Sequence, residues 1–363
     1  MNQAKLSLRD VRVRRGRSEL VAVPHLDVLE GEVLVVIGPN GAGKSILLET
    51  LALLQQPTAG RVLFEGEPVD GRQLRLRRRM AVVFQESAML RRSLVDNVAM
   101  GMRLRGVPRS LRRERARHWM ERFGIDHLAQ RSALTVSGGE AQRANLARAF
   151  SVEPEVLLLD EPFSALDQPT RDDLLEDLSA ALRETGVTTV FVTHDRGEAL
   201  RLGDRVAVLM GGVIRQMGTA AEVFAAPADE EVAAFVGVEN IVPGRVRSLA
   251  DGLATLDLGG LAVEAVASTL ELGAEVLACL RPEDIVIEPA GSDSHRTSAR
   301  NHLRGSVSRI TPLGGQARVV VDCGFPLVAL ITKQSLEDLR LRVGDEAVAS
   351  FKASAVHLIP RRR

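Results

Sequence analysis

Cysteine and aromatic residues are scarce in this sequence. Its 363 residues include two cysteines and no tyrosine, and Phe, Trp and Tyr together make up 3%. Cys279 and Cys323 lie in separate segments without a Cys-x-x-Cys pair, so neither a disulfide framework nor a cysteine-rich zinc site is available. The shortage of rings also argues against the stacking platforms that bind single-stranded nucleic acid.

An excess of one charge and a long apolar run are also absent. Basic and acidic residues both number 47, so no net field attracts nucleic acid, and we expect no nucleic-acid partner. Met1–Asp10 lacks the apolar stretch of a signal peptide, and apolar runs such as Val33–Ile37 are far shorter than a membrane span. We therefore expect a cytoplasmic protein that reaches a membrane only through a partner chain.

Residues 1–236 have the pattern of an α/β domain. Apolar runs alternate with amphipathic stretches from Gly31 to about Met210, which is typical of a mostly parallel sheet. Residues of about 90–150, including the arginine-rich stretch Ser93–Gln130, are expected to form a helical subdomain. The expected strands are Val33–Ile37, Met80–Phe84, Val156–Leu159, Val187–Thr193 and Arg205–Leu209.

Residues 237–363 predict a second, all-β domain. Short Val, Leu and Ala runs are separated there by Gly, Pro and Asp turns. A weak repeat is visible, because Asn240 and Gly244 are echoed by Asn301 and Gly305. We expect two halves, about 238–289 and 299–361, joined by the Ser-, Asp- and Gly-rich linker Pro289–Ser298.

A phosphate-binding motif follows the first expected strand. Residues 38–45 match GxxxxGK[ST] and precede the helical pattern Ile46–Leu54. Glycines let backbone N–H groups face phosphate oxygens, while Lys44 reaches the β- and γ-phosphates and Ser45 places its hydroxyl on Mg²⁺. The sequence therefore predicts a nucleotide site formed by Gly38, Pro39, Asn40, Gly41, Ala42, Gly43, Lys44 and Ser45.

Polar residues at the ends of other apolar runs complete this chemistry. Asp160 can organise the Mg²⁺ shell, and Glu161 can polarise an attacking water. His194 is interpreted as a γ-phosphate sensor, or alternatively as a strand-end residue beside a helix cap. Ser137 and Glu140 fit a capping box, and that helix N-terminus could also meet a γ-phosphate from a second subunit.

Together these motifs resemble those of the ATP-binding cassette (ABC) ATPases over about residues 5–236. The resemblance implies a P-loop NTPase fold, ATP and Mg²⁺ as cofactors, and a Walker A loop at residues 38–45. It implies a Q-loop glutamine at Gln85, a signature motif at Val136–Glu140 and a D-loop at Ser164–Asp167. Catalysis would fall to Glu161, His194 and Gln85, and Mg²⁺ would be held by Ser45, Gln85 and Asp160.

The resemblance also implies partners. In that family two copies form a head-to-tail dimer, in which each ATP lies between one P-loop and the opposite signature motif, here Ser137, Gly138, Gly139 and Glu140. ATP-driven closure then drives a transmembrane permease, which would place this chain on the inner face of the cell membrane. We expect Glu86–Gly106 to meet that permease.

One departure from the family concerns the nucleotide base. The family normally has an adenine-stacking aromatic residue early in the domain, and Val11–Arg17 has no ring. Because a guanidinium plane can stack on a base, we expect Arg15, or alternatively Arg14, to replace it.

The β domain resembles the TOBE module of importer ATPases, and its second half resembles the oxyanion-binding Mop version. By analogy four donors would converge on molybdate or tungstate: Ser298, Arg300, Lys352 and Ser354. This favours the ATPase subunit of a molybdate or tungstate importer, indirectly served by an external oxyanion-binding protein. The alternatives are another cargo (sugar, polyamine, sulfate or ferric iron) with a β domain used only for dimerisation, a soluble cassette ATPase acting on ribosomes or DNA, and an oxyanion buffer.

Overall fold

The computed structural model describes residues 3–69, 73–86, 88–267, 270–290 and 297–361. Most of the expected linker Pro289–Ser298, and Ser87 of the expected permease surface, lie outside these residues. The chain divides into two compact units, Met1–Val223 and Phe224–Arg363. The sequence led us to expect the second domain to begin at residue 237. Each unit is described by itself.

A six-stranded sheet forms the centre of the N-terminal unit. Four adjacent strand pairs are parallel. Only Val213–Thr219, the strand that follows the Gly211-Gly212 turn, runs antiparallel to its neighbour. The expected mostly parallel sheet is therefore confirmed. The strand order is β10 (Val213–Thr219), β9 (Arg205–Met210), β3 (Val33–Ile37), β8 (Thr188–Thr193), β7 (Val156–Asp160) and β6 (Met80–Val83).

The N-terminal unit also contains an antiparallel sheet that we did not predict, because we recognised the α/β pattern only from Gly31 onward. Apolar residues of β1 (Ala4–Arg15), such as Leu6, Leu8 and Val11, are buried in the same core as the six-stranded sheet. Helix α1 (Lys44–Leu51) contacts strands of both sheets. The four strands are β2 (Ser18–Leu29), β1 (Ala4–Arg15), β4 (Ala59–Phe64) and β5 (Glu67–Pro68).

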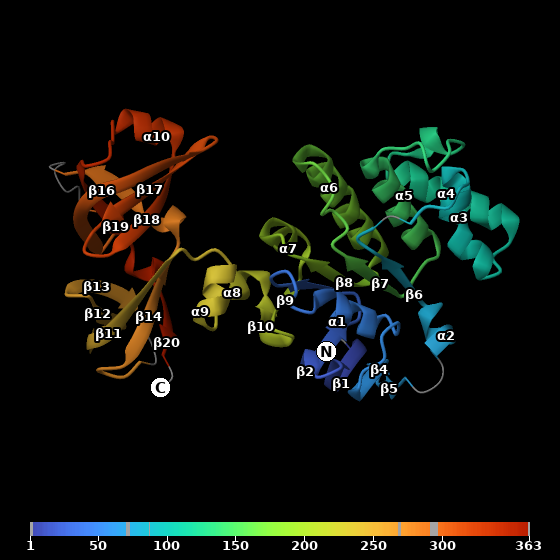
Figure 1. The fold of residues 1–363 in the computed structure, drawn as a ribbon, viewed down its shortest axis with the longest axis horizontal. Coiled ribbons are helices and arrows are strands. Elements are labelled where there is room, and N and C mark those ends of the chain that lie inside the picture. The colour runs from blue at the N-terminus through green and yellow to red at the C-terminus, as the bar shows by residue number, and fades with distance from the viewer. Residues whose placement is uncertain (1–2, 70–72, 87, 268–269, 291–296, 362–363) are drawn as a thin grey trace. The chain divides into compact units, whose positions relative to one another are not determined.

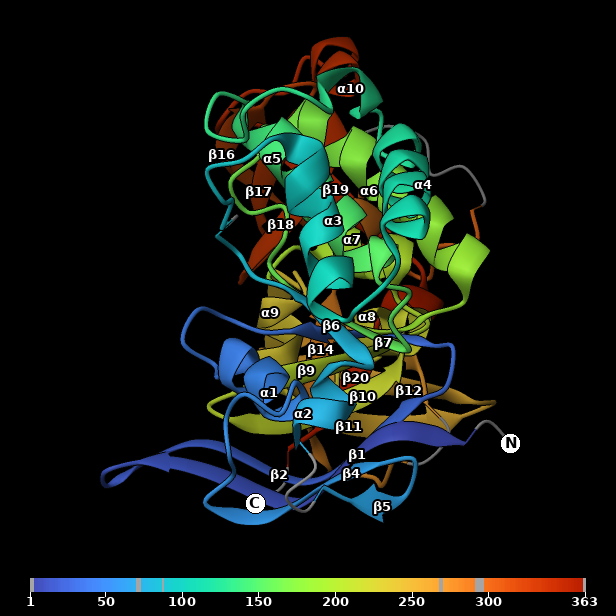
Figure 2. The same cartoon turned by 90° about the vertical axis from the view of Figure 1, so that its right-hand side faces the viewer.

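The expected helical subdomain is formed by three helices that pack on one another at one side of the unit (Figures 1 and 2). Trp119 stacks on Phe150 with ring centroids 4.7 Å apart, and Phe123 lies 5.8 Å from the same ring. Several of the few aromatic residues thus hold this subdomain together. Its helices are α3 (Leu94–Leu104), α4 (Arg109–Arg122) and α5 (Gly138–Ser151).

The other helices of the N-terminal unit are α2 (Gln73–Arg77), η1 (Asp126–Leu128), α6 (Gln168–Thr185) and α7 (Arg196–Leu202). Helix α8 (Ala220–Ala225) spans the division between the units, and α9 (Glu230–Phe235) belongs to the C-terminal unit.

Four charged side chains connect the two sheets at the amino ends of the parallel strands, whereas the P-loop follows the carboxyl end of β3. Lys5 Nζ lies 2.6 Å from a carboxylate oxygen of Glu65 and 2.7 Å from one of Glu155. Arg79 bonds to the same two carboxylates at 2.8 and 2.5 Å. The cluster therefore joins β1, β4 and the loops that precede β6 and β7.

This cluster predicts an acid-sensitive contribution to stability. The hydrogen bond from Arg79, helped by Lys5, lowers the pKa of Glu155 to about 2. A carboxylate whose pKa is lower in the folded state stabilises above the unfolded pKa of about 4.3 and loses this effect as pH falls towards the folded value. Glu155→Gln should cost about 1 kcal/mol at pH 7, a figure discounted because Glu155 is partly exposed.

The measurement is denaturant unfolding of both proteins at pH 7, 5 and 3.5, followed by the fluorescence of the single tryptophan, Trp119, which lies in the N-terminal unit. The difference in unfolding free energy should be equal at pH 7 and 5 and smaller at 3.5. A difference that stays constant down to pH 3.5 would contradict the assignment.

The C-terminal unit contains two five-stranded sheets. The first has the order β13 (Leu261–Val266), β12 (Leu253–Leu258), β11 (Asn240–Ala250), β14 (Glu275–Leu280) and β20 (His357–Pro360). The second has the order β15 (Val286–Pro289), β19 (Glu346–Phe351), β16 (Asn301–Leu313), β17 (Gln316–Asp322) and β18 (Pro326–Thr332). Helix α10 (Lys333–Asp338) and the short turns η2 (Pro282–Asp284) and η3 (Ala353–Ala355) complete the unit.

The two halves of this unit exchange their last strands, whereas the sequence led us to expect halves joined only by a linker. Strand β15 follows the first half in sequence but pairs with β19. Strand β20 follows the second half but pairs with β14 (Figure 1). One hydrophobic core is shared by both sheets. The halves are therefore interlocked and cannot separate without breaking two strand pairings.

The repeated asparagines have equivalent roles in this interlock. The amide of Asn240 bonds to the N–H of Val328 at 2.6 Å and to its carbonyl at 2.9 Å. The amide of Asn301 bonds to the N–H and carbonyl of Glu264 at 2.7 and 2.9 Å. Each half thus fixes a buried asparagine on the backbone of the other half, which explains why the sequence repeats at these positions.

Candidate active site

The phosphate-binding loop connects β3 to α1, and two of its glycines have no room for a side chain. A Cβ atom at Gly38 would lie 2.1 Å from the carbonyl oxygen of Leu209. Gly43 has φ +96°, and a Cβ there would lie 2.7 Å from the carbonyl oxygen of Leu20. The loop therefore fits tightly between β9 and β2, which is possible only for glycine at these positions.

The lysine of this loop is buried and points back over it. Lys44 Nζ donates to the carbonyl oxygens of Gly38 at 2.9 Å and Pro39 at 3.2 Å. It also lies 3.2 Å from Oε1 of Glu161. The loop thus holds an ammonium group beside the first turn of α1, where backbone N–H groups and the helix dipole also favour negative phosphate groups.

Asp160 and Ser45 form a pair that suits a divalent cation. Burial raises the pKa of Asp160, while a hydrogen bond with Ser45 opposes that shift. Among the described residues, the buried Oδ1 of Asp160 has no hydrogen-bond partner. An unpaired carboxylate oxygen beside a hydroxyl is the kind of oxygen ligand set that Mg²⁺ takes. Gln85 is exposed and lies two residues after the end of β6, the strand next to β7.

Glu161 adopts a backbone conformation that is uncommon for a residue other than glycine. Its φ is +42°, and its N–H donates to the carbonyl of Val192 at 2.9 Å. Its carbonyl accepts from the N–H and hydroxyl of Ser164 at 3.2 and 3.0 Å. Such strain persists only where surrounding bonds hold the residue, and it occurs often in active sites.

The Glu161 side chain links the P-loop to His194. Its Oε2 lies 2.9 Å from Nδ1 of His194, and its Oε1 faces Lys44. Sequence reasoning identified all three residues but not their direct contact, because the contact joins segments far apart in the chain. The arrangement places a carboxylate beside an exposed imidazole, where it can accept a proton from a water molecule.

The expected capping box at the signature motif is confirmed. Ser137 Oγ accepts from the N–H of Glu140 at 3.3 Å, and Glu140 accepts from the N–H of Ser137 at 2.6 Å. The second bond lowers the pKa of Glu140. Helix α5 therefore begins with its capping groups already paired. The glycines that follow Ser137, of which Gly138 is exposed and Gly139 half-buried, place no side chain over its start.

The tip of the β1–β2 hairpin distinguishes between the two arginines proposed for the base. Arg14 is ion-paired with Glu19 at 3.1 Å, and Glu19 lines the pocket beside the P-loop. Arg15 pairs with Ser18 through its backbone, but its exposed side chain forms no ion pair or hydrogen bond with the other described residues. This geometry favours Arg15 over Arg14 as the stacking residue.

Arg15→Ala should therefore raise the Kd for ATP about tenfold, since stacking on a base contributes roughly 1–3 kcal/mol. Arg14→Ala should change it by less than about threefold, because the Arg14 guanidinium is already held by Glu19. Calorimetric titration of the full chain with ATP checks both. Equal losses in the two variants would mean that Arg15 does not stack.

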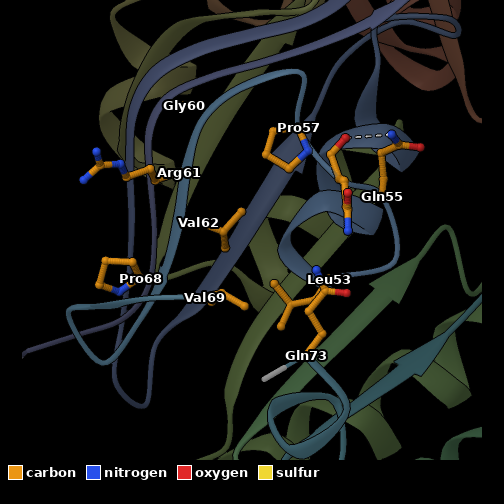
Figure 3. A pocket seen from close by; sticks show the side chains of 10 residues that line it. Leu53, Gln55, Pro57, Gly60, Arg61, Val62, Pro68, Val69 and Gln73 are labelled. Carbon is orange, nitrogen blue, oxygen red and sulfur yellow. Dashed lines mark hydrogen bonds between the residues drawn. The ribbon is translucent and has the colours of Figure 1, made fainter. Parts of the chain in front are cut away.

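A separate small pocket contains none of the expected site residues. It lies between the end of α1 and the β4–β5 hairpin, where Leu53, Val62 and Val69 surround it (Figure 3). Gln55 donates to the carbonyl of Gln56 beside it. No ionisable group other than Arg61 lines it within the described residues, so it does not compete with the P-loop as a catalytic site.

The four expected oxyanion donors are all exposed in the C-terminal unit. The pairing of Asn301 with Phe351 places Arg300 and Lys352 at neighbouring strand ends. Arg300 is ion-paired with Glu264, which lowers the pKa of that carboxyl group. No hydrogen bond joins Lys352 to the other donors within the described residues. In the single chain, one of the four donors is thus already engaged by a carboxylate.

Residues 22–164 match the family described as ABC transporter, and residues 297–358 match the TOBE domain. A relative from Pyrococcus horikoshii, the molybdate/tungstate import ATP-binding protein WtpC, is 41% identical over 336 residues, which cover 92% of this chain and 94% of that protein. This chain belongs to the ABC transporter family. It is an ABC transporter ATPase with a C-terminal TOBE domain.

Other relatives and structures agree with this assignment. The sulfate/thiosulfate import ATP-binding protein CysA of Thermosynechococcus vestitus is 34% identical and covers 93% of each chain. The structure of cbiO1 from Clostridium perfringens, part of an ABC transporter complex, has a TM-score of 0.58 at 28% identity, covering 65% of this chain and 96% of that one.

The dimeric ATP-binding cassette MJ0796 bound to ADP and Pi has a TM-score of 0.54 at 28% identity, covering 59% of this ABC ATPase and 98% of that chain. No helix in the described part of the chain is long and apolar enough to cross a membrane.

Proposed function

We propose that this ABC ATPase powers the import of molybdate or tungstate. The observation that carries the proposal is the 41% identity to a molybdate/tungstate import protein, which extends through the TOBE domain as well as the ATPase domain. The sulfate/thiosulfate relatives are either less identical over a similar length, 34% over 93% of this chain, or 42% identical over only 72% of it, and the Fe(3+) relative from Streptomyces avermitilis is 40% identical over 66%. These two cargoes remain the alternatives to be tested.

In the proposed mechanism two copies bind ATP between the P-loop of one and the Ser137–Glu140 segment of the other. The N–H groups of residues 38–45 and Lys44 hold the phosphates. Ser45, Asp160 and Gln85 would hold Mg²⁺, which supplies neutralisation of phosphate charge. Glu161 accepts a proton from the attacking water, and His194 orients Glu161 and the γ-phosphate.

A cleft next to Gln85 is the proposed contact for a membrane permease. Leu54 and Phe84 are large apolar residues that are nearly half exposed, and with Gly101 and Val152 they line one hollow. Through Gly101 it overlaps the expected surface Glu86–Gly106. A permease segment seated there would contact Phe84, the neighbour of Gln85, and would hold the ATPase at the inner face of the membrane. Co-purification with membrane proteins rather than nucleic acid would distinguish this role from that of a soluble cassette ATPase.

The TOBE domain is proposed to bind the oxyanion through Ser298, Arg300, Lys352 and Ser354. Lys352 is one of only four lysines in the chain and offers a compact charge with three donors. Because these donors are exposed in one chain, a second copy is proposed to close the site. Glu264 would compete with the oxyanion for Arg300.

Calorimetric titration of the full chain with molybdate, tungstate, sulfate and phosphate tests this proposal. Lys352→Ala should weaken binding of the two heavy oxyanions at least tenfold, whereas the matched control Lys333→Ala, an exposed lysine of the same domain, should not. Glu264→Gln should tighten binding several-fold, because it removes a negative charge and releases Arg300. Preference for sulfate would favour the sulfate alternative. No binding at all would leave the domain a dimerisation module.

A further inference from the structure

Arg171, on the first turn of α6, joins two segments of the active site. Its Nη2 donates to the carbonyl oxygen of Leu166 at 3.2 Å, in the turn that follows Glu161. Its Nη1 lies 3.4 Å from Oδ2 of Asp195, the residue directly after His194. One guanidinium group therefore bridges the turn that follows the catalytic carboxylate and the turn that carries the histidine.

These contacts close a ring around the reacting groups. On one side Glu161 and His194 touch at 2.9 Å, and the backbone of Glu161 is held by Ser164. On the other side the chain leads from His194 to Asp195, and Arg171 connects Asp195 back to the turn that contains Ser164. Without Arg171 this side of the ring is open, and the two turns remain joined on the other side, by the Glu161–His194 contact and by the bond from the Glu161 N–H to the Val192 carbonyl.

The acceptor Asp195 is itself firmly fixed. Its Oδ1 accepts from the N–H of Glu198 and caps α7 at 3.1 Å. Its N–H donates to the hydroxyl of Thr193 at 2.9 Å, and that hydroxyl donates to Glu198 at 2.5 Å. One oxygen of Asp195 caps the helix and the other faces Arg171. A displacement of Arg171 would therefore act on Asp195, the residue next to His194.

The guanidinium is largely enclosed and incompletely paired. The Arg171 side chain is 22% exposed, and its buried Nε has no hydrogen-bond partner among the described residues. A buried donor without a partner is unfavourable, so a simple surface ion pair would not require this placement. An arginine at this position therefore contributes to the site through its two Nη bonds, to Leu166 and Asp195.

We propose that Arg171 is a positioning residue for ATP hydrolysis. It ties the turn after Glu161 to the turn that carries His194 and so keeps the carboxylate and the imidazole in register. It acts through the Leu166 carbonyl and the Asp195 carboxylate, which are its contacts in the structure. The proposal depends on the ATPase activity of the chain and not on its cargo.

Steady-state ATPase kinetics of the full chain test the proposal, with Arg201→Ala as the matched control. Arg201 on α7 bonds to Asp172 on α6 at 2.9 Å. It therefore joins the helices that follow the two turns, but it contacts neither turn itself. Arg171→Ala should lower kcat about tenfold to a hundredfold with KM for ATP changed less than about threefold, because misplaced catalytic groups slow the chemical step. Arg171→Lys should be intermediate, and Arg201→Ala should retain kcat within about twofold.

Asp195→Asn supplies an independent test, because asparagine keeps the helix cap but loses the charge that faces Arg171. It should lower kcat as Arg171→Ala does, and the double variant should fall no further than the lower single variant. Equal kcat values for Arg171→Ala and Arg201→Ala, additive effects in the double variant, or a rise in KM without a fall in kcat would each overturn the proposal. If Arg171→Ala does not fold, Arg171→Lys and Asp195→Asn decide the outcome by the same criteria.

Discussion

Glu161→Gln is expected to reduce ATP hydrolysis about a thousandfold, the middle of the range that a general base contributes, while ATP binding is retained. Glutamine has nearly the same shape and can still contact Lys44 and His194, which lie 3.2 and 2.9 Å from the carboxylate. It cannot accept the proton of the attacking water. The measurement combines the rate of phosphate release with calorimetric titration of ATP.

Glu49→Gln is the matched control for this experiment. Glu49 lies on α1 and is close enough to raise the pKa of Asp160, but it contacts neither Lys44 nor His194. Removing its charge should change hydrolysis less than about threefold. If Glu161→Gln loses no more activity than Glu49→Gln, the proton acceptor is another group. If ATP binding is lost together with hydrolysis, the Lys44–Glu161 contact is needed to shape the P-loop.

Local sequence motifs predicted the parts of this site that depend on neighbouring residues. The P-loop at 38–45 and the capping box at Ser137 and Glu140 follow from backbone geometry over a few residues, so their spacing identifies them. Strand ends at Asp160 and His194 were also predictable, because buried apolar runs mark them. These features needed no knowledge of what lies on the other side of the sheet.

The relations between segments could not be predicted in this way. Lys44 and Glu161 meet at 3.2 Å although more than a hundred residues separate them, and Arg171 reaches both Leu166 and Asp195. The positive φ of Glu161 also has no local signal, since the residue is not a glycine. Each depends on how β7, β8 and α6 are arranged, which one sequence does not specify.

The fold has the same division between local and non-local features. Alternation of apolar residues predicts that a strand forms, but not which strand it pairs with. The repeat around Asn240 and Asn301 therefore indicated two halves without indicating that β15 and β20 change places. The exchange occurs after the equivalent short turns η2 and η3, where the chain passes from one sheet to the other.

The repeated glycines of the β domain, Gly244 and Gly305, lie too close to neighbouring strands to carry a side chain. A Cβ at Gly305 would lie 2.2 Å from the carbonyl oxygen of Asp322 and 2.9 Å from the sulfur of Cys323. At the equivalent Gly244 it would lie 2.2 Å from Leu258. Strands β16 and β17 must therefore shift to accept alanine, and Gly305→Ala should destabilise the C-terminal unit by about 3 kcal/mol.

Gly315→Ala is the matched control, because no atom lies within 4 Å of a Cβ at Gly315 in the turn between the same two strands. Calorimetry of the full chain should show a thermal transition lowered by about 10 °C for Gly305→Ala and nearly unchanged for Gly315→Ala. Trp119 fluorescence, which reports the N-terminal unit, should keep its midpoint in both. Since Leu258 can move more easily than a backbone carbonyl, Gly244→Ala should cost less than Gly305→Ala. The reverse order would mean that β16 and β17 do not approach as closely as the repeat requires.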